Sequence, residues 1–424
     1  MFLWINKILS SVIVRSVSVT FFDQLTVSFV QFFIGCIFIY SSTPEEYGIY
    51  SFFISLYYWV ASNQNAIINT PIMVLQPRMT SPIQRAMLMR GMIGLLALLS
   101  LCLLIIGMIT TFCFKNYLAQ KAVTVQHVLW FYFALFPLLL RDFFRANDFA
   151  NLHPIKAFWR DFSYLLVFIF LVGMNSIFYK IDSKSVFMIM GVAAIIVTLK
   201  SFASLIVPLP TIKEITYALQ QSWKISVWSF WGANSSSLRR QAFVYLPFFM
   251  LGVKEIAYLS AARLVMQPVA LLSASWGNYI RPLASKAISS DNLKRIIPVF
   301  IKSTVIILLI VISYALVVLS IFHTLPPSWI PENYRHTENY ILFWSLIIFI
   351  STIAGSFSYF YQASLYFKSL AIVSMLATFF TIIISYYLIK LIGVEGTLAG
   401  RIAGEIFRAF SLAAILKWIS SRYN

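Results

Sequence analysis

The chain has few charged residues, and most of its charge has one sign. Only 11% of its 424 residues are Asp, Glu, Lys or Arg, whereas a soluble domain carries about a quarter. The acidic residues number 14 against 32 Lys and Arg, and 60% of the chain is hydrophobic. This composition excludes an ordinary soluble domain and predicts an integral membrane protein.

Cysteine, histidine and nucleotide-binding motifs are also scarce. Cys36, Cys102 and Cys113 lie in or near apolar stretches without paired spacing, and the four histidines are scattered. We therefore expect no disulfide framework and no metal site. The chain lacks the Gly-x-x-x-x-Gly-Lys-Ser/Thr phosphate loop, so ATP hydrolysis is not expected. No cofactor is predicted, and energy would come from a Na⁺ or H⁺ gradient, the membrane potential or consumption of a cargo.

Hydrophobic stretches long enough to cross a membrane recur along the whole chain. A window of about 19 residues finds about twelve of them. They lie near residues 17–40, 49–75, 91–113, 125–146, 157–178, 186–207, 226–251, 257–280, 297–322, 339–366, 369–390 and 397–418. The sequence therefore predicts an all-α integral membrane protein with about twelve transmembrane helices.

Basic residues between these stretches predict the orientation of the chain in the membrane. With the N-terminus in the cytoplasm, the inner segments hold about 20 Lys and Arg and the outer loops about 7. Both termini are then cytoplasmic. The first stretch has no small-residue cleavage site after it, so we expect a retained helix and not a signal peptide.

An internal repeat relates two parts of the chain at an offset of 209 residues. The turn Pro44–Ser51 matches the turn Val253–Ser260 at three positions, among them Glu46 with Glu255. Each turn follows the first stretch of a block of six. The alternative is chance similarity between two short acidic turns.

The repeat predicts two six-helix bundles. Both matched stretches run outward, so the bundles would be related by an axis along the membrane normal, as in many transporters. The N-terminal bundle would comprise residues 1–207 and the C-terminal bundle residues 226–424, joined by a cytoplasmic linker over residues 208–225.

Two adjacent arginines, Arg239 and Arg240, lie midway along the otherwise apolar stretch 226–251. A charged side chain at bilayer depth costs about 2.5–3.5 kcal/mol on insertion scales, so it usually lines protein or water. At 100° per residue, Asn234 and Gln241 share a polar stripe with Arg240 at its edge, whereas Arg239 points away. This pattern predicts a protein that handles an anionic molecule.

Several motifs resemble those of bacterial polysaccharide transporters. They are residues 23–40, the turn Pro44–Gly48, and the segments Asn69–Val74, Tyr258–Pro268 and Leu391–Gly400. This family comprises the lipid-linked oligosaccharide flippases, O-antigen flippases among them, of the multidrug/oligosaccharidyl-lipid/polysaccharide exporter superfamily. Its motifs are loose and include no catalytic signature.

The resemblance implies a fold and a cargo. Two six-helix bundles would form a V-shaped central cavity that opens alternately to either side of the bacterial inner membrane. The cargo would be an oligosaccharide on polyprenyl pyrophosphate, moved from the cytoplasmic to the outer leaflet. Membrane lipids, a polysaccharide polymerase and chain-length machinery are the implied partners. No enzymatic activity and no nucleic-acid partner are expected.

Given such a cargo, the arginines are candidate pyrophosphate ligands, because guanidinium binds phosphate oxygens bidentately. Arg240 is the leading candidate, followed by Arg239 and Arg263. Arg239 could instead pair between helices, and Arg263 could lock the two halves together.

Amide side chains suit a sugar because they donate and accept hydrogen bonds without fixed charge. The candidates are Gln31, Gln24, Asn65, Asn69, Asn234 and Gln241. The alternative for all of them is bonding between helices.

Three groups of charged residues are candidates for coupling or gating. They are Asp23; Arg401, Glu405 and Arg408; and Arg141, Asp142 and Arg145. Asp23 is a candidate cation or proton site, or an ion-pair partner. The group in the last stretch is either an internal salt-bridge stripe or a gating network.

The third group, Arg141 to Arg145, can cross-pair with Arg160 and Asp161 of the next stretch. It is either a cytoplasmic gate or ordinary positive-inside anchoring. Separately, Gly396, Gly400 and Gly404 recur every four residues, which would let a second helix approach closely.

Other functions compete with the flippase interpretation. A multidrug antiporter of the same superfamily should place acidic residues around a cationic cargo, yet the intramembrane charges are mainly arginine. A membrane polymerase or ligase should need a large outer catalytic loop, and the longest outer loop, His323 to Glu338, has about 16 residues. A scaffold protein that transports nothing would have no need for polar residues in its interior.

Overall fold

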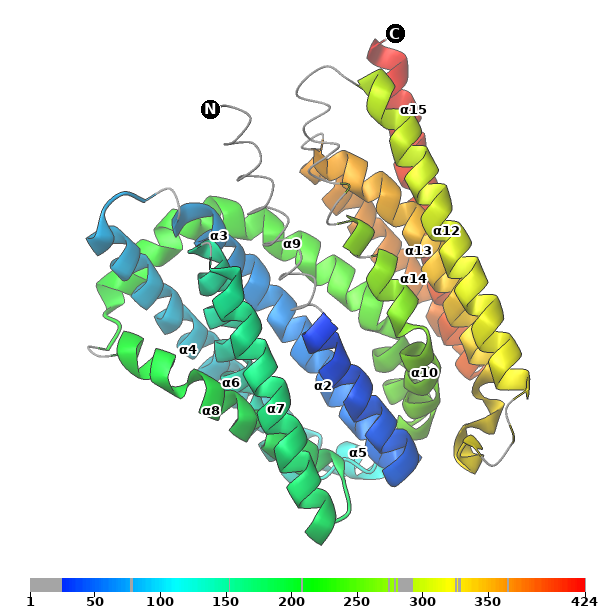
Figure 1. Cartoon of the computed structure of the whole chain (residues 1–424), viewed down its shortest axis with the longest axis horizontal. Helices are drawn as coiled ribbons and strands as arrows, with labels where there is room; N and C mark the ends of the chain where they lie inside the picture. The colour runs from blue at the N-terminus through cyan, green and yellow to red at the C-terminus, as the bar shows by residue number, and fades with distance from the viewer. Residues whose placement is uncertain are drawn as a thin grey trace, which may run out of the picture. The chain divides into compact units, whose positions relative to one another are not determined.

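A computed structural model describes most of the chain. The described residues are 25–76, 79–151, 153–206, 209–273, 275–277, 280, 293–324, 326, 329–363 and 366–423. Two of the candidate residues, Asp23 and Gln24, lie outside them. The described residues form helices and connecting turns and contain no strand (Figure 1).

Each of the twelve expected stretches overlaps a helix over the residues that the structure describes. The first falls on the helix Leu25–Ser41. The others fall on α2 (Pro44–Gln64) with η1 (Asn65–Asn69) and α3 (Thr70–Leu75), α4 (Pro82–Cys113), α6 (Val125–Ala150), α7 (Pro154–Phe178), α8 (Ser183–Ile206), α9 (Ile212–Met250), α10 (Val253–Val265) with the helix Gln267–Gly277, α12 (Leu293–Thr324), α13 (Glu338–Ala363), α14 (Phe367–Ile392) and α15 (Val394–Tyr423). The prediction of an all-α membrane fold is confirmed.

Composition separates these helices into two kinds. Within the described residues, seven helices are long and apolar enough to cross a membrane, or eight if the bent pair Val253–Val265 and Gln267–Gly277 is one span. α9 and α15 are also long enough, with 39 and 30 residues. Their mean hydropathy is lower because they carry the arginines and glutamates of the interior.

The chain divides into two compact units. Unit 1 includes the described residues up to Ser42 and residues 56–230, and unit 2 includes residues 43–55 and the described residues from Trp231 onward. Two helices contribute to both units, because two of the three boundaries fall within α2 and within α9, whereas the third, after Ser42, precedes α2. The expected linker over residues 208–225 is largely helical, since α9 begins at Ile212. The boundary near the expected linker therefore lies inside α9 and not in a connecting loop.

In unit 1, α6 packs along α8, and α7 packs against both (Figure 1). The start of α6 is fixed by a capping box between Thr124 and His127, which satisfies backbone N–H groups that have no partner inside the helix. Proline at the first turn begins α4 and α7, where its missing N–H costs nothing. Local sequence signals thus begin three of the unit's long helices.

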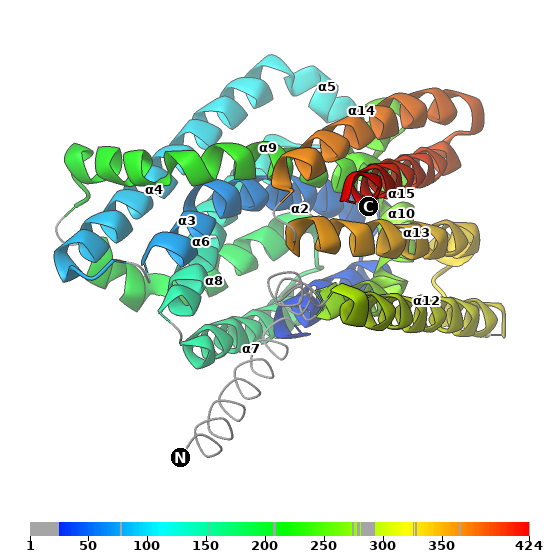
Figure 2. The same cartoon turned by 90° about the horizontal axis from the view of Figure 1, so that it is seen from above.

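In unit 2, α14 and α15 pack side by side (Figure 2). α14 ends at Gly393, whose φ of +66° lets the chain reverse directly into α15. The glycines of α15 face this partner: a Cβ on Gly400 would overlap Ser385, and one on Gly404 would overlap Thr381. The close helix approach predicted from the glycine spacing is confirmed.

The repeated turns lie against each other inside unit 2. α2 begins at Pro44 and α10 at Val253, and 253 − 44 gives the same offset of 209 residues as the sequence match. A Cβ on Gly48 would overlap the backbone carbonyl of Val253. Beside this contact, Lys254 Nζ lies 2.8 Å from Glu45 Oε1. The matched positions therefore begin equivalent helices.

We predict that Gly400→Leu prevents α15 from packing on α14. Extra methylenes in a well-packed site cost about 1–3 kcal/mol, and the overlap at Gly400 is with the backbone of α14 as well as with a side chain. The expected result is a lower melting temperature and less monodisperse protein in detergent. The matched control is Gly173→Leu in α7, where an added Cβ meets nothing within 4 Å. Equal melting temperatures for the two variants would contradict the packing argument.

Candidate functional site

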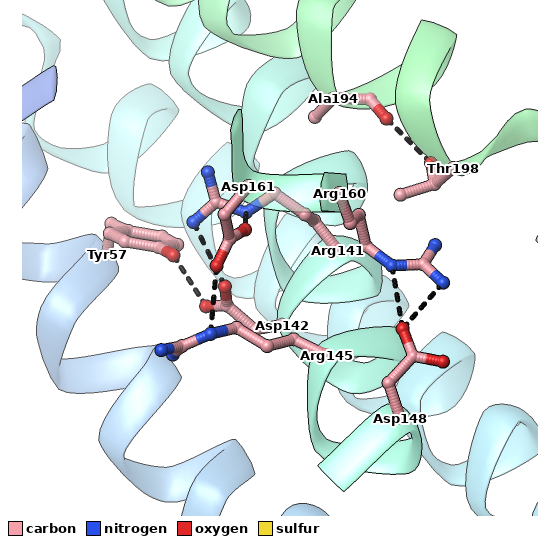
Figure 3. A network of polar contacts seen from close by, with 9 residues as sticks. All are labelled: Tyr57, Arg141, Asp142, Arg145, Asp148, Arg160, Asp161, Ala194 and Thr198. Carbon is pink, nitrogen blue, oxygen red and sulfur yellow. Dashed lines mark hydrogen bonds and ion pairs between the residues drawn. The ribbon is translucent and has the colours of Figure 1, made fainter. Parts of the chain in front are cut away.

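Unit 1 contains a network of buried and half-buried charges between α6 and α7 (Figure 3). Arg145 Nε lies 2.9 Å from Asp161 Oδ2, and Arg160 Nη2 lies 2.8 Å from Asp148 Oδ2. The cross-pairing predicted for this helical hairpin is therefore confirmed at Arg145 and Asp161. Asp148, which the sequence analysis did not single out, supplies the second carboxylate.

The remaining charged residues of this network, Arg141 and Asp142, pair with each other. Arg141 Nη2 donates to Asp142 Oδ1 at 3.1 Å, and the Tyr57 hydroxyl donates to Asp142 Oδ2 at 2.6 Å. The guanidinium of Arg141 also lies over the ring of Tyr164, 4.3 Å from its centroid. Three arginines and three aspartates thus compensate one another. Such a network stabilises the packing of α6 on α7 and carries no net charge for an anion.

Unit 2 contains a second cluster in which positive charge is in excess. It comprises Arg239 and Arg240 from α9, Arg263 from α10, and Arg401, Glu405 and Arg408 from α15. We call these six residues the arginine cluster. Five arginines and one glutamate give these six residues a formal charge of +4. Side-chain contacts divide the cluster into two parts. In the neutralised part the arginines pair with Glu405, and the open part, which includes Arg240, has no ion pair with Glu405.

Glu405 forms the neutralised part with two of the arginines. Its Oε1 lies 2.5 Å from Arg239 Nη1, and its Oε2 lies 3.3 Å from Arg408 Nη1. Both Arg239 and Glu405 are only 2% exposed. Arg239 therefore adopts the interhelical role that the sequence left open, and it is not accessible as a ligand in this structure.

The salt-bridge stripe expected within α15 forms only in part. Arg408 pairs with Glu405, but Arg401 does not. Instead, Arg401 Nη1 donates to the backbone carbonyl of Arg240 at 2.8 Å. Spacing along α15 predicted which of its residues could contact Glu405. The closest partner of Glu405 is instead Arg239 of α9, which is 166 residues away in the sequence. The stripe interpretation is wrong for Arg401.

Arg240 forms the centre of the open part. Its side chain is exposed, and among the described residues no carboxylate lies within ion-pair distance of its guanidinium. Arg263 is also exposed and reaches the same region from α10. Because Arg401 holds the backbone of Arg240, the open arginines belong to one rigid arrangement of helices. An anion with several oxygens fits such a set.

The amide candidates are divided between the two units. Gln31 is half-buried, Asn65 is exposed and Asn69 is buried; all three belong to unit 1. Asn65 and Asn69 are the ends of the π-helix η1, a distortion that is frequent at functional sites. Asn69 Oδ1 accepts a hydrogen bond from Gln64 at 3.5 Å.

In unit 2, Asn234 is half-buried and Gln241 is buried, with Oε1 of Gln241 lacking a hydrogen-bond partner. Gln241 directly follows Arg240 on α9, so its unsatisfied carbonyl adds a polar group beside the open arginines. Four of the candidate site residues, Arg239, Arg240, Arg263 and Gln241, therefore lie in unit 2. Two residues that it missed, Phe243 and Trp344, contact the arginines; nothing distinguishes them in a chain that is 17% aromatic.

We predict that Glu405→Gln destabilises unit 2 strongly. Removing one partner of a buried ion pair leaves an uncompensated charge, which costs about 3–5 kcal/mol. The expected result is a lower melting temperature in micelles, with only partial recovery in the double variant Arg239→Met/Glu405→Gln, because Arg408 still lacks its partner. Glu395→Gln is the control, since Glu395 lies on the same helix and makes no ion pair among the described residues. A destabilisation no larger than that of the control would show that the pair is not essential.

Comparison with known proteins identifies the fold. No family model and no curated protein sequence matches the chain. Solved structures do match. The lipid II flippase MurJ, in an inward closed conformation, has a TM-score of 0.70 with 14% sequence identity, and the match covers 95% of this chain and 87% of that chain.

Two further structures come from the MOP superfamily. An inward-facing multidrug resistance transporter of the MATE family has a TM-score of 0.69 at 10% identity, over 91% of this chain and 93% of that chain. A MOP superfamily transporter from Pyrococcus furiosus, described by the reverse polarity of its binding pocket, has a TM-score of 0.62 at 10% identity, over 97% of this chain and 96% of that chain. The chain is therefore a multi-pass membrane protein with the twelve-helix fold of the MATE transporters and MurJ.

Proposed function

We propose that this protein is an alternating-access flippase for an oligosaccharide linked to polyprenyl pyrophosphate. It would move this lipid from the cytoplasmic to the outer leaflet of a bacterial inner membrane for surface polysaccharide synthesis. One observation carries the proposal: the arginine cluster has five arginines and one carboxylate, and Arg240 is exposed within it. Pyrophosphate is the part of such a lipid that needs these cations.

The charge of the cluster favours an anionic cargo over a cationic one. An excess positive charge in a low-dielectric interior repels a cationic drug and attracts a phosphate. This argues against the alternative, a multidrug antiporter, although MATE transporters are among the structures with this fold. MurJ, named a lipid II flippase, shows that the fold accommodates a lipid-linked cargo.

The remaining candidate residues have roles that follow from this cargo. The amides Gln31, Asn65, Asn69, Asn234 and Gln241 would contact the sugar. Coupling to a Na⁺ or H⁺ gradient stays a proposal, as do the gating role of the Arg141–Arg145 group and the polymerase and chain-length partners. The fully paired charges of unit 1 favour a structural role for Arg141, Asp142 and Arg145.

We predict that Arg240→Ala reduces flipping at least tenfold. A hydrogen bond to a charged group contributes about 1.5–3 kcal/mol, and each 1.4 kcal/mol corresponds to a factor of ten. The measurement is the amount of lipid-linked oligosaccharide exposed on the outer face of flippase-deficient cells that make the native glycan. Arg240→Lys should retain part of the activity, because it keeps the charge but loses the bidentate fork.

The matched control is Arg335→Ala, which removes an exposed arginine outside the cluster. If Arg240→Ala flips as well as the wild type, the flippase function stands and the role of Arg240 is wrong. If the wild type inserts correctly but leaves the lipid on the inner face, the proposed function is wrong. Wild-type efflux of cationic dyes would then support the antiporter.

A further inference from the structure

A pair of buried aromatic rings lies directly beside the open arginines. Phe243 of α9 and Trp344 of α13 are 1% and 2% exposed. Their ring centroids are 4.9 Å apart with an interplanar angle of 88°, the edge-to-face arrangement that aromatic pairs prefer. Trp344 Nε1 donates a hydrogen bond to the backbone carbonyl of Leu259 in α10 at 3.0 Å. The pair is therefore fixed by three helices.

Two arginines share both of these rings. The guanidinium carbon of Arg263 lies 5.2 Å from the centroid of Phe243 and 5.9 Å from that of Trp344. The corresponding distances for Arg401 are 5.7 Å and 4.8 Å. All four distances are within the range of about 6 Å for a cation–π interaction. The rings thus bring together two like charges that arrive from different helices.

Aromatic rings and carboxylates stabilise a cation differently. A carboxylate cancels the charge of the arginine, as Glu405 does for part of the cluster. The quadrupole of a ring attracts the guanidinium without adding a negative charge. An arginine held by a ring therefore keeps its full positive charge for a ligand. Among the described residues, Arg401 has no carboxylate within ion-pair distance, so the rings and the Arg240 carbonyl are what hold it.

The geometry also links the rings to Arg240. Phe243 follows Arg240 by three residues, so both lie on the same side of α9, one turn apart. Arg401 spans this turn, because it contacts the ring of Phe243 and the carbonyl of Arg240. Arg240, Arg263 and Arg401 are consequently arranged around one aromatic pair.

We infer that Phe243 and Trp344 are positioning residues of the anion site, which hold Arg263 and Arg401 beside Arg240 for a group with two adjacent phosphates. This inference rests on the proposed function and deepens it. One phosphate can be bound by a single guanidinium fork, whereas a diphosphate presents oxygens on two centres and uses a set of three. The site should therefore prefer diphosphate to monophosphate, and the preference should depend on the rings.

The test uses the purified full-length protein in nanodiscs, with inorganic pyrophosphate and inorganic phosphate as probes. We expect the wild type to bind pyrophosphate at least tenfold more tightly than phosphate. Phe243→Leu and Trp344→Leu should each weaken pyrophosphate binding about 5- to 30-fold, because a desolvated cation–π interaction contributes about 1–2 kcal/mol. Trp344→Phe keeps a ring and should retain most of the affinity, although it loses the hydrogen bond to Leu259.

The control is Phe248→Leu. Phe248 is also 1% exposed and lies on α9, but its ring stacks on Phe52 at 3.8 Å. It should leave the ratio of pyrophosphate to phosphate affinity unchanged, which separates positioning from general loss of packing. The inference is overturned if the ring variants bind like Phe248→Leu, or if the wild type binds the two probes equally.

The two proposals can fail separately. A wild type that exposes the lipid-linked oligosaccharide in cells but shows no pyrophosphate preference overturns the inference and leaves the flippase function intact. A wild type that shows the preference, lost in the ring variants, but does not flip the lipid overturns the function and leaves the aromatic positioning intact.

Discussion

The buried ion pair between Arg239 and Glu405 fixes the interior of unit 2. Neither residue is accessible, and an unpaired charge at this depth would be too costly to keep. The pair therefore sets how α9 and α15 align. One turn earlier on α15, Arg401 binds the carbonyl of Arg240, so the two helices meet at consecutive residues of α9. These contacts involve Arg239 and the backbone carbonyl of Arg240, and they fix the position from which the exposed Arg240 side chain extends.

The two units treat buried charge in different ways. In unit 1, three arginines meet three aspartates, and the network is closed and neutral. In unit 2, Glu405 pairs with two of the five arginines, and aromatic rings contact two others. The first arrangement holds helices together. The second also holds helices together, but among the described residues it leaves Arg240 and Arg401 without a carboxylate within ion-pair distance, and the proposed anion site depends on this property.

The sequence predicted much of the fold because the bilayer imposes simple rules. Apolar length located all twelve helices, and the glycine spacing located the face of α15 that packs on α14. The sequence also identified Arg239 and Arg240, since charged residues are rare within an apolar stretch. The sequence did not reveal their different roles. Arg239 and Arg240 are adjacent, yet Arg239 is buried against Glu405 and Arg240 is exposed.

Hydropathy, glycine spacing and charge counts thus determined that this chain is a helical membrane protein whose apolar stretches carry more arginine than acidic residues. These properties depend on residue type and on contacts within one helix, which sequence records directly. Only the tertiary structure decided that Glu405 pairs with Arg239 and that Phe243 and Trp344 support Arg263 and Arg401. Those contacts join helices far apart in the chain, and no local pattern distinguishes the few aromatic residues involved from the many others in the sequence.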